Sequence, residues 1–89
     1  MLMGKVIGNI VSTRKHEGIV GSKILEIRII ENGAETDKYI IAVDHGIGAG
    51  IGEIVLVAMG SAARIGTGNE NAPVDAAIVG IVDDGSSLE

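Results

Sequence analysis

The chain has 89 residues with no cysteine, phenylalanine or tryptophan, yet 46% of it is hydrophobic, mostly isoleucine, valine and alanine. This length fits one domain, the β-branched composition favours strands, and the missing cysteines exclude disulfides and thiolate metal sites. The formal net charge of −5 and the single aromatic residue, Tyr39, argue against a nucleic-acid surface, which needs cations for phosphates and often rings for bases.

The two ends of the chain carry no pattern for secretion or membrane insertion. Met1–Gly4 is followed by Lys5, without the charged region and long apolar stretch of a signal peptide. No apolar run approaches the ~20 residues that span a membrane, so we expect a cytoplasmic protein. Residues 86–89, which end in Leu88-Glu89, are interpreted as a tail of the kind that cloning leaves, and residues 1–85 as the single domain.

The first predicted strand is Lys5–Ser12, in which Gly8 marks a bulge or a point of close contact. Thr13–Gly18 follows as a charged loop. Its simplest interpretation is a solvated turn, although its positive charges in an acidic chain leave a binding role open.

The clearest strand signal is Lys23–Ile30, where apolar and charged side chains alternate from Leu25 to Ile29, as in a half-buried strand. Asn32-Gly33 then predicts a tight hairpin turn. The polar residues 35–37 would widen the tip of this hairpin before a return strand over Lys38–Val43.

The centre of the chain combines a glycine-rich loop with an apolar strand. Glycine occupies every second position from Gly46 to Gly52, a spacing that suits neither a helix nor an isolated strand. We expect packing to fix this loop, either in its own domain or against a neighbouring copy. Ile54–Met59 is apolar throughout and predicts a strand buried on both faces. Ser61 then predicts the N-cap of one short helical turn.

The last predicted strand is Ala76–Val82, which follows a polar loop over residues 67–71 and has no polar face. Five short strands separated by turns predict a small all-β barrel. A barrel strand needs only one apolar face, so the outer faces of Ile54–Met59 and Ala76–Val82 would remain in water. Exposed apolar surface of this kind drives association, and the sequence therefore predicts an oligomer.

No motif of the sequence predicts catalysis or cofactor binding. Gly48–Gly52 has the wrong spacing for a dinucleotide fingerprint and precedes a strand rather than a helix. His16 and His45 would need carboxylates to hold a metal, and Asp44 would point away from His45 on an extended chain. Ser61 does not lie in a nucleophile elbow, and Asp83-Asp84 is interpreted as part of a solvated tail. We therefore predict no catalytic, cofactor or metal site.

Three motifs, in this order, resemble the EutN/CcmL family, the vertex proteins of bacterial microcompartment shells, including carboxysomes. They are Gly48-Ala49-Gly50-Ile51-Gly52-Glu53 with the strand after it, Gly60-Ser61-Ala62-Ala63-Arg64, and Ala72-Pro73-Val74-Asp75 with the final strand. The segments 4–8 and 13–25 are similar to the family as well. The family pattern has a shorter link between the aspartate and Gly-Ala-Gly, whereas His45-Gly46-Ile47 intervenes here and leaves the loop shape open.

The resemblance implies a five-stranded OB-like β-barrel with one short helical turn. It also implies a non-enzymatic homopentamer at the fivefold vertices of a shell whose facets are hexamers, with no cofactor and no nucleic-acid or membrane partner. The motif residues would lie at subunit contacts or near a central pore: Gly48, Ala49, Gly50, Gly52, Glu53, Ser61, Ala62, Ala63, Arg64, Pro73, Val74 and Asp75.

On this hypothesis, Gly50→Asp or Ala63→Arg disrupts the ring. Arg64 would pair with a carboxylate of a neighbouring subunit, either Glu53 or Asp75. The alternatives that remain are an OB-type nucleic-acid-binding module and a module that binds a small ligand or phosphate through the glycine loop.

Overall fold

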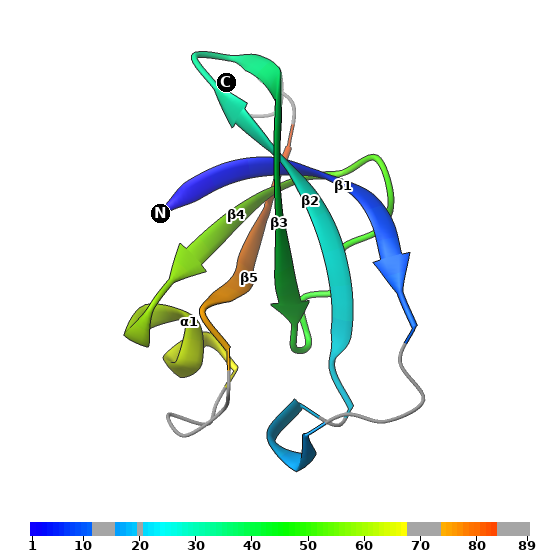
Figure 1. Ribbon diagram of the computed structural model, residues 1–89, viewed down its shortest axis with the longest axis vertical. Helices are drawn as coiled ribbons and strands as arrows, with labels where there is room; N and C mark the ends of the chain where they lie inside the picture. The colour runs from blue at the N-terminus through cyan, green and yellow to red at the C-terminus, as the bar shows by residue number, and fades with distance from the viewer. Residues whose placement is uncertain (12–15, 20, 68–73, 84–89) are drawn as a thin grey trace.

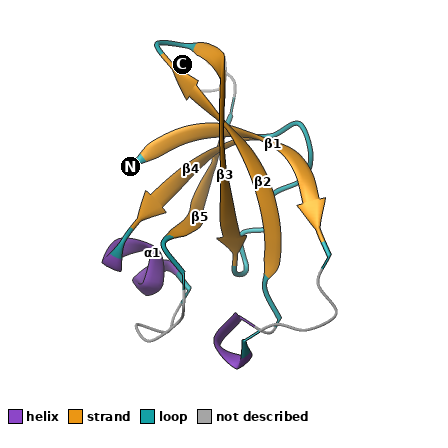
Figure 2. Cartoon of the chain, viewed as in Figure 1, coloured by secondary structure: helices purple, strands orange, loops and turns teal. Residues whose placement is uncertain are grey.

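The computed structural model of the chain describes residues 1–11, 16–19, 21–67 and 74–83 (Figure 1). The predictions for residues 13–15, 68–71 and Pro73, and for the tail from Asp84, lie outside these residues. The described residues form β1 (Leu2–Ile10), the 3-10 helix η1 (Glu17–Ile19), β2 (Lys23–Glu31), β3 (Ala34–Asp44), β4 (Ile54–Met59), α1 (Ser61–Gly66) and β5 (Ala76–Val82). The strands close into a barrel in the order β1-β2-β3-β5-β4 (Figure 2). The predicted all-β barrel is therefore confirmed.

The interior of the barrel is filled by alternate side chains of all five strands and by one residue of the glycine-rich loop. A narrow barrel leaves room only for side chains, and this one uses small and branched ones. The core consists of Val6, Leu25, Ile27, Ala42, Ala49, Val55, Val57, Ala76 and Ile78. Complete burial of each large member stabilises the fold by ~1.5–3 kcal/mol.

β1 begins at Leu2 rather than at the predicted Lys5, because its first residues pair with β4 as well as with β2. The register with β2 shifts between Val6 and Gly8, which confirms the predicted irregularity at Gly8. Gly4 allows β1 and β2 to pack closely: a Cβ there would collide with the Ile27 side chain and lie 2.9 Å from the Arg28 carbonyl oxygen.

The hairpin between β2 and β3 turns at Asn32-Gly33, as predicted. Both residues have positive φ, 53° and 78°, as a two-residue primed turn requires. The prediction of a widened tip is wrong, because β3 starts at Ala34 and includes residues 35–37. A register shift between Arg28 and Ile30 accommodates them, and Thr36 Oγ1 donates a hydrogen bond to the Ile29 carbonyl at 2.7 Å. The hairpin tip projects beyond the barrel (Figure 1).

β4 and β5 have the predicted bounds and are apolar on both faces. Val55 and Val57 point into the core and are fully buried. Ile54 and Leu56 alternate with them on the outside and remain partly exposed. Within a single chain, the prediction of burial on both faces is therefore met on the inner face, whereas on the outer face only the Ala58–Ala77 pair is buried.

The barrel closes between β3 and β5, which are parallel and pair at one position of the described chain, Val43 opposite Ala77. Helix α1 lies outside this seam, where Ala63 packs with Val43, Val74 and Ala77 in a second apolar cluster.

Ser61 is not the N-cap of α1, contrary to the prediction. Gly60 occupies that position, with φ 63° and no side-chain capping bond. The turn out of β4 needs positive φ, which glycine adopts at little cost. The Gly60 amide also donates to the Asp75 carbonyl oxygen at 2.9 Å, so backbone contacts define the start of the helix.

Candidate functional site

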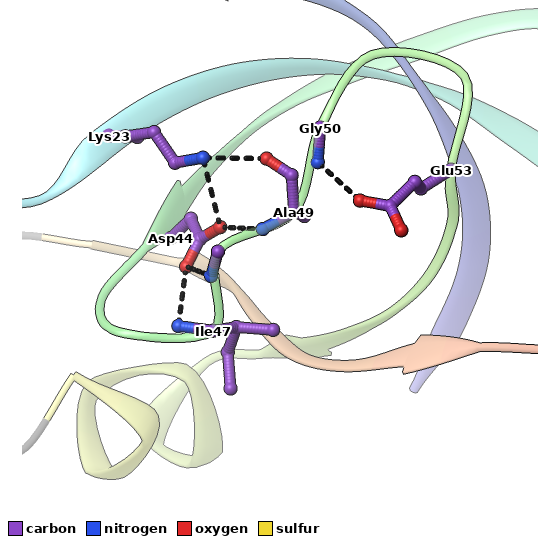
Figure 3. Close-up of polar contacts among 7 residues, drawn as sticks. Lys23, Asp44, Ile47, Ala49, Gly50 and Glu53 are labelled. Carbon is purple, nitrogen blue, oxygen red and sulfur yellow. Dashed lines mark hydrogen bonds and ion pairs between the residues drawn. The ribbon is translucent and has the colours of Figure 1, made fainter.

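The glycine-rich loop, residues 44–53, is held by the buried carboxylate of Asp44 (Figure 3). Its Oδ1 accepts hydrogen bonds from the amides of Ile47 at 2.9 Å and Gly48 at 3.2 Å, and its Oδ2 accepts one from Ala49 at 2.7 Å. These amides belong to residues three, four and five positions after Asp44, beyond the second residue that an Asx turn uses, so the carboxylate organises a longer stretch of the loop. The sequence prediction missed this role, although an aspartate directly before a glycine-rich run was the available signal.

Lys23 supplies the cation for this buried carboxylate. Its Nζ lies 3.9 Å from Asp44 Oδ2 and donates a hydrogen bond to the Ala49 carbonyl oxygen at 2.7 Å. The Asp44 side chain is 0% exposed, whereas that of Lys23 is 44% exposed. A buried carboxylate without partners would strongly destabilise the fold, so Lys23 and the three amides together make its burial tolerable.

The second half of the loop is fixed by Glu53 and by β1. Glu53 Oε1 accepts a hydrogen bond from the Gly50 amide at 2.6 Å. The Gly52 amide donates to the Val6 carbonyl oxygen at 2.8 Å, and the Val6 amide donates to the Glu53 carbonyl oxygen at 3.0 Å. Of the two alternatives for what fixes this loop, the structure therefore shows contacts within its own domain.

His45-Gly46-Ile47 forms the turn directly after β3, where Gly46 has φ 85°. Asp44 is buried and His45 is exposed, so their side chains point apart. His45 Nδ1 lies 2.9 Å from Ser22 Oγ in a hydrogen bond. Within the described ranges, no three His, Cys, Asp or Glu residues are grouped to hold a metal ion.

The helical turn forms the second part of the site. Arg64 Nη1 lies 3.7 Å from Asp75 Oδ1 and 3.5 Å from the Val74 carbonyl oxygen, both in the same chain. The Asp75 side chain is 91% exposed, so this ion pair contributes little to stability. Glu53 Oε1 accepts the hydrogen bond from the Gly50 amide of its own chain, and the pairing of Arg64 with a carboxylate of a neighbouring subunit stays a prediction.

The motif residues differ in whether they are accessible to a partner. Ala49, Ala63 and Val74 are buried within their own chain. The accessible members are Gly48, Gly52, Glu53, Ser61, Ala62 and Asp75, with Gly50 and Arg64 partly exposed. The two parts of the site are joined at the end of β3, because Val43 packs under α1 and Asp44 holds the loop.

The polar groups of this site mostly hold backbone in place rather than converge on a ligand. The loop amides bind the carboxylates of Asp44 and Glu53, and Arg64 binds a carbonyl and a carboxylate of its own chain. None of the helices in the described part of the chain is long and apolar enough to cross a membrane. Fold and site together define a small OB-like β-barrel whose glycine-rich loop is held by hydrogen bonds within the chain.

Comparison with known proteins identifies the family. The family described as "Ethanolamine utilisation protein EutN/carboxysome" matches residues 1–83, and the chain belongs to this EutN/CcmL family. It is 46% identical to the carboxysome shell vertex protein CcmL of Nostoc sp., over 93% of this chain and 83% of that protein. It is 48% identical to the bacterial microcompartment shell vertex protein GrpN of Rhodospirillum rubrum, over 93% of both chains.

Solved structures of the family have the same fold. A structure of the ethanolamine utilization protein EutN matches with a TM-score of 0.89 and 40% identity, covering 94% of this chain and 88% of that one. The GrpN pentameric microcompartment shell protein from Rhodospirillum rubrum matches with a TM-score of 0.83 and 42% identity, covering 94% and 95%. The OB-like barrel expected from the resemblance is thereby confirmed.

Proposed function

We propose that this chain is a structural shell protein whose homopentamer caps the fivefold vertices of a bacterial microcompartment. The observation that carries the proposal is identity of 46% and 48% to two shell vertex proteins over 93% of the chain. The barrel is also similar to a shell protein described as pentameric. The apolar outer faces of β4 and β5 support assembly, because they remain partly exposed in one chain.

The function follows from geometry rather than from chemistry. Identical subunits around a rotation axis each present one patch to a different patch of the next subunit, and the ring closes when the rotation allows it. A rigid surface lowers the entropy cost of such contacts, and the Asp44 and Glu53 carboxylates fix the loop before assembly. The pentamer would occupy corners between hexamers of other shell proteins, in the cytoplasm and without catalytic activity.

The accessible motif residues are proposed to lie at subunit contacts or near the pore of this ring. Ala62 and Ala63 provide a matched pair for a test, because Ala62 is exposed on α1 and Ala63 is buried beneath it. We expect Ala62→Arg to fold and to weaken the ring. Ala63→Arg should instead unfold the helical turn, so it tests the fold of the subunit rather than the contact.

Native mass spectrometry of the purified protein over a range of concentrations tests the proposal first. A dominant pentamer is expected, and a stable monomer at every concentration would contradict it. Co-expression with hexameric shell proteins then tests the vertex role by electron microscopy. We expect closed polyhedra with this protein and open shells or sheets without it, whereas closed shells in both cases would remove the vertex role.

A further inference from the structure

We infer that the ring contact joins two different walls of the barrel, an apolar wall on β4 and β5 of one copy and a wall carrying Tyr39 on β2 and β3 of the next. The inference rests on the proposed pentamer and adds which surfaces meet. The β4–β5 wall comprises Met3, Ile54, Leu56, Gly80 and Val82. The β2–β3 wall comprises Glu26, Arg28, Tyr39 and Ile41.

The β4–β5 wall is the outer face of three neighbouring strands. Leu56 lies opposite Met3 on β1 and opposite Gly80 on β5. The rows on either side of it contain Val55 and Val57, which are fully buried in the core, so this row faces outward. Ile54 and Val82 form the next outward row. On β1 this second row continues with Lys5, which lies opposite Ile54 and whose Nζ is 3.6 Å from Glu35 Oε2. The wall is therefore apolar on β4 and β5 and bordered by a lysine on β1. Its apolar part remains partly exposed, and such surfaces mark interaction sites.

The β2–β3 wall carries the only aromatic residue of the chain, on the outside of the barrel. Tyr39 is 50% exposed and Ile41 is 53% exposed. The Arg28 guanidinium lies 5.2 Å from the centre of the Tyr39 ring, and its Nη2 donates to the Tyr39 hydroxyl at 3.0 Å. Glu35 lies 3.8 Å from Arg28 and partly balances its charge. Tyrosine and arginine are enriched at protein interfaces and among the residues that contribute most to binding, so this ordered pair is suited to anchor a contact.

The positions of the two walls suit a ring. The strand order β1-β2-β3-β5-β4 puts β2 and β3 on one side of the barrel and β4 and β5 on the other. Cyclic assembly requires contacts between two different patches of the same subunit, whereas a twofold dimer would use one patch twice. A second copy of this chain is therefore the occupant that fits each wall, in agreement with the pentameric relative at 42% identity.

Charged substitutions test whether both walls are needed. Ile41→Lys keeps the barrel pairing favourable, because Glu26 lies directly opposite on β2, but it places a charge in the β2–β3 wall. Leu56→Lys does the same to the β4–β5 wall. Met3→Lys in the same row replaces it if that variant fails to fold, as judged by circular dichroism. Val11→Lys, at a position 87% exposed and outside both walls, is the matched control.

The expected result in native mass spectrometry is a pentamer for the wild type and for Val11→Lys, and folded monomers for both wall variants. A wall variant that folds and remains a pentamer overturns the inference but leaves the proposed function intact. A wild-type monomer, in contrast, overturns the proposed function itself. Dissociation of Val11→Lys as well would show that any added charge breaks the ring, and would also overturn the inference.

Crosslinking tests whether the two walls face each other, since the natural chain has no cysteine. The double variant Ile41→Cys/Leu56→Cys, treated with a short bismaleimide, should give a ladder up to five linked subunits in denaturing gels. Each single-cysteine variant should stay monomeric in the same gel. Linked dimers from a single variant would mean that identical walls meet, and no ladder from the double variant would mean that these walls do not meet. Either result overturns the inference.

Discussion

The buried carboxylate of Asp44 offers the sharpest test of how the loop is held. Asp44→Asn preserves the size of the side chain but leaves one acceptor oxygen where two now serve three amides and Lys23. Ile47 and Gly48 are exposed, so their amides can turn to water, whereas Ala49 is buried and its amide cannot. The net loss is one buried charge-assisted hydrogen bond together with the attraction of Lys23. This amounts to ~2–4 kcal/mol.

A domain of this size is stable by ~4–13 kcal/mol in total, so the variant should lose a large part of its stability. A loss near ~3 kcal/mol lowers the melting temperature by ~12–24 °C. Urea unfolding followed by circular dichroism measures it, at one fixed subunit concentration because oligomers unfold in a concentration-dependent way. Asp37→Asn is the control, since Asp37 is exposed. A loss below ~0.5 kcal/mol for Asp44→Asn, equal to the control, would refute the argument that this carboxylate holds the loop.

Three further substitutions and one control have clear expectations in thermal unfolding. Gly4→Ala should destabilise the fold by ~1–3 kcal/mol, because the added methyl group would collide with the Ile27 side chain. Gly80→Ala is the control and should be tolerated, since the nearest atom to its added Cβ would lie at 3.9 Å. Gly33→Ala should cost ~1 kcal/mol because φ is 78° there, and an unchanged melting temperature would exclude the primed turn. Lys23→Met should cost ~1 kcal/mol, less than Asp44→Asn; a larger loss would mean that the exposed lysine matters more than the amides.

The parts of the fold that could be predicted are those where pattern and burial agree. The bounds of β4 and β5 were predicted correctly because each is an uninterrupted apolar run between turn residues. The Asn32-Gly33 turn was predicted for a similar reason, since its conformation depends on two residues alone.

The start of β3 was predicted incorrectly because residues 35–37 are polar on both faces. In the structure this part of the hairpin extends beyond the barrel (Figure 1), and five of the six residues 34–39 are exposed. A strand without a buried face has no apolar alternation, so its sequence resembles that of a loop.

The organisation of the glycine-rich loop could not be predicted for a different reason. The direction of the three amides that bind Asp44 depends on positive φ at Gly46 and Gly48, and the cation comes from Lys23, far away in the sequence. These are tertiary relations that local pattern does not encode. The motif residues were located by resemblance, and their roles at contacts or pore remain predictions.

The seam between β3 and β5 has a consequence for how the subunit opens. In the described chain these two strands pair at a single position, Val43 opposite Ala77. The barrel is therefore closed here mainly by side-chain packing and not by a continuous ladder of backbone hydrogen bonds. Helix α1 contributes to this packing, since Ala63 lies in one apolar cluster with Val43 of β3 and Ala77 of β5. Local opening of the barrel should begin between β3 and β5, because a region with few backbone hydrogen bonds has low local stability. The barrel would open between β3 and β5 without separating any antiparallel strand pair. A neighbouring subunit packed against α1 would oppose this opening.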